Sequence, residues 1–205
     1  MKTKTKALAL ALCAVLLVVS TVFVTMAYLT STDSVTNTFT VGKVTITLDE
    51  AKVDEYGKEE EGASRVDANT YKLIPGHTYT KDPQIHVDTN SEDCYLFVKI
   101  ENGLGTDGTI NGLEENGWKA VDKQTGIYCY YGTDANGNLN ENKKIVTANE
   151  NIDVFDTFTF GEKANPETHT NNEIIVTAYA IQADGFASKT VAETWASVNT
   201  ENTTK

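Results

Sequence analysis

Short runs rich in β-branched and aromatic residues recur along most of the chain, and clusters of Gly, Asn and Asp separate them. The longest turn-forming clusters are NGLGTDGTING at 102–112 and GTDANGNLNEN at 132–142. The following runs are predicted as strands: 35–41, 43–49, 84–88, 94–101, 117–121, 126–131, 144–147, 156–160 and 173–182. Many short strands with turn-rich connections indicate an all-β sandwich or barrel rather than alternating β-α-β units.

The run at 173–182 differs from the others because both of its faces are apolar. One face would carry Ile174, Val176, Ala178 and Ala180, and the other Ile175, Tyr179 and Ile181. A strand with two apolar faces is typical of a position covered on both sides. We therefore expect this run to be a central strand.

The segment after that run predicts a helix. Its apolar residues recur at the spacing of one helical face: Val191, Trp195 and Val198. Thr190 and Glu193 match a capping box, which starts a helix. We expect a short C-terminal helix at about 188–198 that packs Trp195 against the sandwich, with a disordered polar tail at 199–205.

The beginning of the chain has a different character. It carries three basic residues and no acidic ones: Lys2, Lys4 and Lys6. A basic segment, an apolar stretch and a small residue are typical of a secretory signal peptide, here a signal helix in residues 1–27 with cleavage between Ala27 and Tyr28. The apolar stretch 7–29 is also long enough, at about 1.5 Å per residue, to span about 30 Å of bilayer, so an uncleaved membrane anchor is the alternative. Cys13 is interpreted as an apolar filler of this leader.

The charge of the chain follows from this division. The whole chain has 17 basic and 29 acidic residues and a formal net charge of −12. Without the three leader lysines, 14 basic residues remain against 29 acidic ones, a net charge of −15. Because the cations do not cluster, no nucleic-acid binding is expected.

Residues 28–42, at the start of the mature chain, show an alternation that changes phase. Every even position from 30 to 40 is Ser or Thr, while four odd positions are apolar: Leu29, Val35, Phe39 and Val41. Beyond Gly42 the even positions become apolar, at Val44, Ile46 and Leu48. A strand cannot exchange its faces without a bulge or kink, so Gly42 is predicted to be that break. The segment is either a bent first strand of its own sandwich or a detachable strand that completes the sheet of another molecule.

The two cysteines of the body are Cys94 and Cys129. An even number of cysteines in an exported domain permits a disulfide but does not require it. Cys94 lies in CYLFVKIE on the same predicted face as three apolar residues, so a small buried side chain explains it equally well. The sequence leaves both interpretations open because it does not give the distance between the two residues.

Three stretches, in this order, resemble one protein family. The leader and TMAYLTSTDSVTNTFTVGKVTITL resemble the start of secreted proteins that the dedicated signal peptidase SipW processes. LIPGHTYTKDPQIHVDTNSEDCYLFVKI at 73–100 is similar to a segment of the biofilm fibre protein TasA and its relative camelysin. VTAYAIQADGF at 176–186, before a Trp-containing helix, resembles the closing strand of many SipW-dependent proteins. The likeness covers about half of the chain and not residues 102–172.

The resemblance implies a jelly-roll-like β-sandwich exported by a Gram-positive bacterium, with its domain at 43–198. In TasA-like fibres the freed N-terminal segment inserts into the neighbouring subunit as a donor strand, which here corresponds to residues 28–41. Pro75 and Gly76 would form the turn into the next strand. Lys81 and Asp82 also match the family pattern, and we interpret them as a solvated pair.

Camelysin-like relatives are classed as metallopeptidases, and a zinc peptidase needs ligands that converge from a fixed scaffold together with a carboxylate base. The chain has no His-Glu-x-x-His motif, and its three histidines are His77, His86 and His169. His86 and Asp88 share a strand face, which allows a pair of metal ligands or simply an exposed polar face. Asp134, Asn136 and Asn138 alternate as in a calcium loop, but Leu139 stands where that loop needs Gly, and a hairpin turn at Asn136-Gly137 fits better. No cofactor and no catalytic residue is predicted.

Three classes of function are compatible with these features. The first, which we prefer, is a secreted structural protein of the extracellular matrix that assembles with itself or with related matrix subunits by strand donation. The others are a camelysin-like surface metallopeptidase and a monomeric surface adhesin or ligand-binding module. The signal peptidase would be a partner during export, and only residues 7–29 would contact a membrane, if uncleaved.

Overall fold

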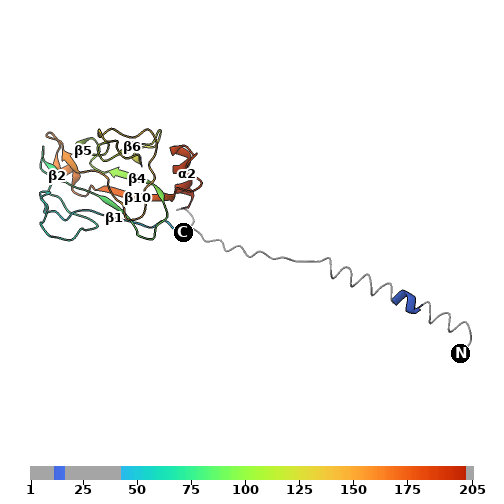
Figure 1. The fold of residues 1–205 in the computed structure, drawn as a ribbon. Helices are drawn as coiled ribbons and strands as arrows, with labels where there is room; N and C mark the ends of the chain where they lie inside the picture. The colour runs from blue at the N-terminus through green and yellow to red at the C-terminus, as the bar shows by residue number, and fades with distance from the viewer. Residues whose placement is uncertain (1–11, 17–42, 202–205) are drawn as a thin grey trace, which may run out of the picture. The chain divides into compact units, whose positions relative to one another are not determined.

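The β-rich runs form three antiparallel sheets in the computed structural model, which describes residues 12–16 and 43–201 (Figure 1). Residues 12–16 are helical and belong to a unit at 1–40 that is separate from the unit at 41–205. Within the described residues no helix has the length and apolar character that a membrane span requires. The predicted cleavage site, the segment 28–42 with its break at Gly42, and most of the tail lie outside the described residues.

Each sheet joins strands that are distant in sequence. The four-stranded sheet has the order β10 (Ile174–Gln182), β4 (Cys94–Asn102), β7 (Ile127–Tyr130) and β6 (Trp118–Ala120). A three-stranded sheet has the order β1 (Ile46–Asp49), β3 (Gln84–Val87) and β8 (Asn151–Asp153). The second three-stranded sheet has the order β2 (Thr78–Thr80), β9 (Thr157–Phe160) and β5 (Gly108–Asn111). Two 3-10 turns, Gly105–Asp107 and Pro166–His169, lie in the connections.

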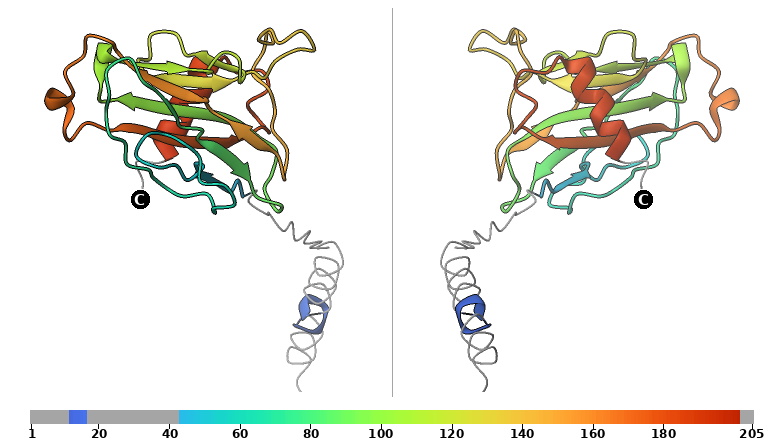
Figure 2. Two further views of the ribbon diagram at one scale, coloured as in Figure 1. Left: turned by 90° about the vertical axis from the view of Figure 1, so that its left-hand side faces the viewer. Right: turned by 90° about the vertical axis from the view of Figure 1, so that its right-hand side faces the viewer.

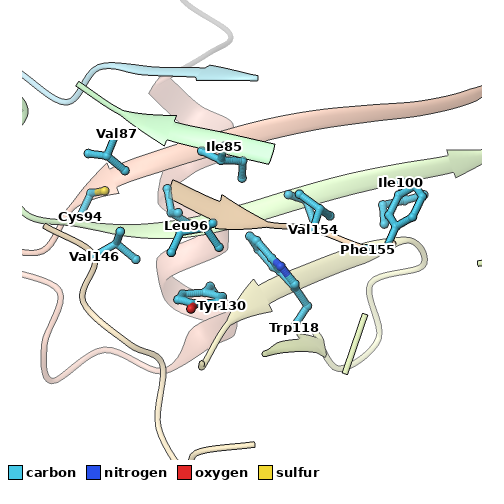
Figure 3. Packing of buried hydrophobic residues seen from close by; sticks show 12 residues of the cluster. Ile85, Val87, Cys94, Leu96, Ile100, Trp118, Tyr130, Val146, Val154 and Phe155 are labelled. Atoms are coloured by element: carbon cyan, nitrogen blue, oxygen red, sulfur yellow. The ribbon is translucent and has the colours of Figure 1, made fainter. Parts of the chain in front are cut away.

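The main core lies on one face of the four-stranded sheet. In β4 the even-numbered side chains are buried in it: Cys94, Leu96, Val98 and Ile100. They pack with Ile85 and Val87 of β3 and with Ile152 of β8, so the β1-β3-β8 sheet covers this face (Figure 3). Trp118 is fully buried in the same cluster and donates its indole N–H to the Asp153 carbonyl at 2.8 Å. The alternation of β4 therefore separates two cores, one on each face.

The opposite face of the four-stranded sheet is covered by α2 (Val191–Glu201), which lies across it (Figure 2). The predicted helix is thus confirmed, but it begins at Val191 and continues to Glu201, three residues into the segment predicted as a disordered tail. Thr190 and Glu193 form the expected capping box, with the Thr190 N–H donating to Glu193 Oε2 at 2.8 Å and the Glu193 N–H donating to Thr190 Oγ1 at 3.3 Å. Trp195 is buried and contacts the rings of Phe97 and Tyr179, at centroid distances of 5.5 and 5.2 Å.

The structure corrects part of the predicted strand pattern. The long strand β10 is at the edge of its sheet, not at the centre, and β4 occupies the inner position. The run at 144–147 forms only an isolated bridge, between Cys94 and Val146. Strands β2, β5 and β8 were not predicted, because β5 lies inside a Gly- and Asn-rich segment and the other two are only three residues long.

Candidate functional site

A cleft of about 740 Å³ opens beside the first half of β10. One side is formed by the end of β1 and Glu50, and the second by the segment 67–73. The third side consists of residues 169–173 and the first residues of β10. The cleft therefore lies where β1 and β10, each at the edge of its own sheet, approach each other without pairing.

The segment 67–73 is held in place by side chains rather than by strand pairing. Asn69 accepts a hydrogen bond from the Val53 N–H at 3.0 Å and donates to the Ala51 carbonyl at 2.8 Å. The Tyr71 hydroxyl donates to the Thr80 carbonyl at 3.1 Å. The Tyr71 ring also meets Phe158 edge-on, with centroids 5.1 Å apart. The wall of the cleft thus has a fixed form because its amide and aromatic side chains are anchored on β2, β9 and the chain after β1.

Glu50 is the most deeply buried charged residue in this wall, with 3% of its surface exposed. One of its carboxylate oxygens contacts Lys81 Nζ, and the other accepts a hydrogen bond from Asn69 Nδ2 at 2.9 Å. The side chain of Lys81 is only 11% exposed, so the expectation of a solvated Lys81–Asp82 pair is wrong. Burial raises the pKa of the neighbouring Tyr71, and the negative charge of Glu50 raises it further.

A second polar cluster lies next to Glu50 and is centred on Arg65. Its guanidinium binds Asp49 through Nε and Asp82 through Nη1, the latter at 3.0 Å. His86 Nε2 lies 2.9 Å from Asp49 Oδ1, and its Nδ1 lies 2.9 Å from Asn151 Oδ1. Burial alone would raise the pKa of Asp49 and lower that of His86. The hydrogen bonds and opposite charges outweigh burial, so the pKa of Asp49 is lowered and that of His86 is raised.

His169 closes the far side of the cleft. Its Nε2 lies 3.0 Å from Asp107 Oδ2, and Asn172 Nδ2 lies 2.8 Å from its Nδ1. Both ring nitrogens are therefore used, and they hold the segment 161–172 against the turn before β5.

The outer edge of β10 is the second component of the site. Hydrogen bonds from the Gly103 N–H to the Glu173 carbonyl and from the Ala183 N–H to the Asp93 carbonyl flank its ladder with β4. In antiparallel pairing, the odd-numbered residues of β10 therefore turn their N–H and C=O groups toward β4, and the even-numbered ones turn them outward. Within residues 43–201 nothing pairs with these outward groups, which belong to Ile174, Val176, Ala178, Ala180 and Gln182.

Side chains along this edge remain partly exposed. The apolar residues of the even face, from Ile174 to Ala180, are only half-buried against the main core. The side chains of the buried strand β4, by contrast, are almost completely enclosed on the same face. The sandwich is therefore open along β10, and the opening is continuous with the cleft at Ile174 and Val176.

The predicted site residues in the described part of the chain are separated from one another. Pro75 and Gly76 form a turn before β2, in which Gly76 has φ +77° and the His77 N–H donates to the Ile74 carbonyl at 3.1 Å. A turn of this geometry needs a residue that tolerates positive φ at its second central position, and Pro is favoured at the first. His86 faces Asp49 and Asn151, whereas Asp88 accepts from the Asn90 N–H. Both residues line a small cleft of about 240 Å³, but their side chains have different hydrogen-bond partners.

Cys94 and Cys129 are both free thiols, so the disulfide considered from the sequence is not formed. Cys94 belongs to the core beneath the β1-β3-β8 sheet, and Cys129 belongs to the core beneath α2. Cys129 is paired with Phe97, whose side chain lies on the face opposite that of Cys94. The four-stranded sheet therefore separates the two sulfur atoms.

The segment with Asp134, Asn136 and Asn138, whose alternation is similar to that of a calcium loop, forms a hairpin turn, as predicted at Asn136-Gly137. Asp134 accepts from the backbone N–H groups of Asn136 and Asn138, and residues Thr133 and Leu139 form a bridge. Its carboxylate oxygen is thus occupied by the turn itself. Among the described residues, no group of three or more His, Cys, Asp or Glu side chains is placed to hold a metal ion.

The polar residues of the cleft wall were not predicted from the sequence. One signal was present: Glu50 continues the even-numbered series of Val44, Ile46 and Leu48, which points into the core. A carboxylate in phase with buried residues indicates a group that needs a partner. Arg65 and Asn69 have no comparable pattern, because they lie in a segment without regular structure.

Comparison with protein-family models, with curated proteins and with solved structures found no match for this chain.

Proposed function

We propose that this chain is a secreted structural protein of the TasA/camelysin type, which assembles in the extracellular matrix of a Gram-positive bacterium. In this proposal a signal helix in residues 1–27 is removed by a SipW-like signal peptidase between Ala27 and Tyr28. The sandwich is of the jelly-roll type. The freed segment 28–41 of one subunit then pairs with the open edge of β10 in the next subunit.

The observation that carries this proposal is the length and openness of β10. Among the described strands that end a sheet, β10 has nine residues, whereas β1 and β5 have four and β2, β6 and β8 have three. Proteins usually keep exposed edges short or charged, because a long apolar edge pairs with other chains. The edge of β10 is long, apolar and without charge from Ile174 to Gln182.

The incoming segment would suit this edge in both backbone and side chains. Its backbone would satisfy the outward N–H and C=O groups of β10, which give strand addition its affinity. Its apolar odd-numbered residues, Leu29, Val35, Phe39 and Val41, would cover the half-buried even face and enter the adjoining cleft. The Ser and Thr residues at even positions would remain in solvent.

The substitution Ala178→Pro tests the acceptor edge. Residue 178 turns its N–H outward, so proline removes a donor for an incoming strand without removing a hydrogen bond to β4. We expect protein that begins at Tyr28 to form fibres in negative-stain microscopy, and Ala178→Pro to remain monomeric. Ala178→Ser, which keeps the N–H, is the matched control and should form fibres.

Two further preparations test the donor segment. Deletion of residues 28–41 and addition of residues before Tyr28 should both prevent fibre formation. Circular dichroism of each preparation establishes that the sandwich is folded. Fibres of normal yield from the deletion variant, or from folded Ala178→Pro protein, would refute strand donation to β10.

A further inference from the structure

Lys81, Glu50 and Asn69 form a cluster in the wall of the cleft whose chemistry strand donation does not use. The two oxygens of one buried carboxylate contact the amine of Lys81 on one side and the amide nitrogen of Asn69 on the other. Both partners are therefore held next to the same proton acceptor, and the side chains of Glu50 and Lys81 are only 4% and 11% exposed. An amine, an amide and a shared carboxylate are the groups required for an amide exchange between two side chains.

We propose that Lys81 and Asn69 become joined by an isopeptide bond, with Glu50 as the catalytic acid and base. The cluster lies on three separate segments: the end of β1, the irregular wall at 67–73 and the residue that follows β2. Folding brings these segments together, so the reaction needs no other enzyme. It would proceed once in each folded chain.

The reaction can be written with atoms and charges in balance. Glu50 takes a proton from the Lys81 ammonium group, and the lone pair of Nζ then forms a bond to Cγ of Asn69. Glu50 returns that proton to Nδ2, the Cγ–Nδ2 bond breaks and ammonia leaves. The new amide nitrogen releases its extra proton through Glu50 to the ammonia, which departs as ammonium. No oxidant, reductant or cofactor is consumed.

The surroundings favour each step of this exchange. The Val53 N–H donates to Asn69 Oδ1 at 3.0 Å, so it polarises the carbonyl and stabilises the negative charge that develops on this oxygen. The Ala51 carbonyl, which accepts from Nδ2 at 2.8 Å, fixes the orientation of the leaving group. The rings of Tyr71, Tyr79 and Phe158 pack together beside the cluster, with centroids 4.8 to 5.6 Å apart. They restrict water, which would otherwise compete with the amine.

The bond would have a structural consequence. It would close a loop from residue 69 to residue 81, which contains the Pro75-Gly76 turn and β2. The wall of the cleft would then be covalently attached to the residue that follows β2. Such a cross-link stabilises the folded chain mainly because it restricts the unfolded one, as a disulfide does. Unlike a disulfide, it would not be cleaved by reducing agents.

Mass spectrometry of the purified full chain tests the proposal directly. Loss of ammonia should lower the intact mass by about 17 Da relative to the mass of the sequence as purified. Trypsin should then yield a branched peptide in which 66–72 is joined to 73–99, because modified Lys81 is not cleaved. Unmodified protein would instead yield 73–81 and 82–99 as separate peptides.

Three variants separate the bond from other causes. Lys81→Arg keeps a cation beside Glu50, and Glu50→Gln keeps the shape of the side chain, but both should show the full mass and no branched peptide. Lys72→Arg, in the same wall but outside the cluster, should retain the loss of about 17 Da. Succinimide formation at an Asn-Gly pair also releases ammonia, but it would persist in Lys81→Arg protein.

The outcomes are decisive because wild-type protein alone can refute the bond. A wild-type chain at its full sequence mass would overturn the proposal. The proposal would also be overturned if wild-type protein gave no branched peptide and its loss of mass persisted in the Lys81→Arg variant. Neither result depends on fibre formation, so this proposal and strand donation can fail independently.

Discussion

At the scale of single residues, Cys94 and Cys129 show how a sheet determines the chemistry of a side chain. Both are fully buried, and they lie on opposite faces of the same four strands. Burial raises the pKa of each thiol to about 12, with nearby acidic residues adding to the effect at Cys94. Because the thiolate is the reactive form, both side chains should be inert in the folded protein.

Thiol titration checks this expectation. In the full native chain, only the exposed Cys13 should react with a thiol reagent, and Cys94 and Cys129 should react only after unfolding in urea. The count in urea should be the same with and without prior reduction. A Cys94→Val variant should lose one urea-dependent thiol and nothing else. A rise in the count after reduction would instead reveal a disulfide.

His86 predicts a pH dependence of stability. Its pKa is raised in the folded state, so its contribution is complete below the unfolded value of 6.5 and disappears as pH rises through the folded value. Its partner Asp49 has a lowered pKa, so that contribution is present above its unfolded value of 3.8 and is lost as pH falls through the folded value. The pair therefore stabilises the fold most between these two pH values.

Urea unfolding at several pH values measures this contribution. From pH 6 to pH 8 wild-type protein should lose about 0.5–1 kcal/mol of unfolding free energy relative to a His86→Asn variant, a modest amount because the pair is partly exposed. Asn keeps a polar side chain but does not titrate. An identical pH profile for the two proteins would show that the His86–Asp49 contact contributes nothing.

Residue-level prediction from sequence succeeded where a periodic pattern was present. Thr190, Glu193 and Trp195 could be placed because a helix repeats every few residues and its first turn needs a cap. Arg65 and Asn69 could not be predicted, since their partners lie 16 to 19 positions away and are reached only after folding. Such contacts depend on tertiary structure, which local propensity does not encode.

At the scale of elements, the turns that begin at Asp54 and Asp134 have the same hydrogen-bond pattern. Asp54 and Asp134 each accept from the backbone N–H groups two and four residues later, and each is followed by a glycine at the third position. Gly57 and Gly137 have φ values of +80° and +81°. Their surroundings differ, because a Cβ on Gly57 would lie 2.8 Å from Tyr79 Cα, whereas one on Gly137 would meet nothing within 4 Å.

This pair of glycines makes a matched experiment. Gly137→Ala should cost about 1–2 kcal/mol, because the only penalty is an L-residue in a left-handed conformation. Gly57→Ala should cost about 1–3 kcal/mol more, since β2 must also move to relieve the clash. Urea unfolding of both variants measures the difference. Equal losses would mean that the backbone near Tyr79 adjusts freely.

Some strands could be located from the sequence, whereas others were missed or assigned to the wrong position in their sheet. Alternating runs such as β4 and β9, with their buried odd or even positions, were located from sequence to within one or two residues. β5 was missed because its residues, GTIN, resemble a turn, yet it pairs with β9 over four positions. The position of β10 at an edge was also missed. The apolar pattern of a strand reports which of its two faces are buried, because the side chains point to those faces. It does not report whether the backbone groups along its edge are paired, so a central strand and an edge strand can have the same pattern.

At the scale of the whole molecule, the open edge of β10 and the net charge have opposite effects. The edge favours association by supplying unpaired backbone groups along nine residues. The chain without its leader lysines has a net charge of −15, which makes subunits repel one another at a distance. If fibres form as proposed, association must overcome this repulsion before backbone pairing begins.

Salt should therefore accelerate fibre formation. The Debye length falls from about 30 Å in about 10 mM salt to about 8 Å in about 150 mM, so repulsion between approaching subunits should be largely screened in the second solution. Turbidity or light scattering of protein that begins at Tyr28 should rise several-fold faster at the higher salt, and calcium should act at lower concentration than sodium because of its double charge. Ala178→Pro protein should show no increase at either concentration, since screening does not restore the missing edge donor. Assembly that is fastest at low ionic strength and insensitive to cations would show that charge repulsion does not limit the encounter.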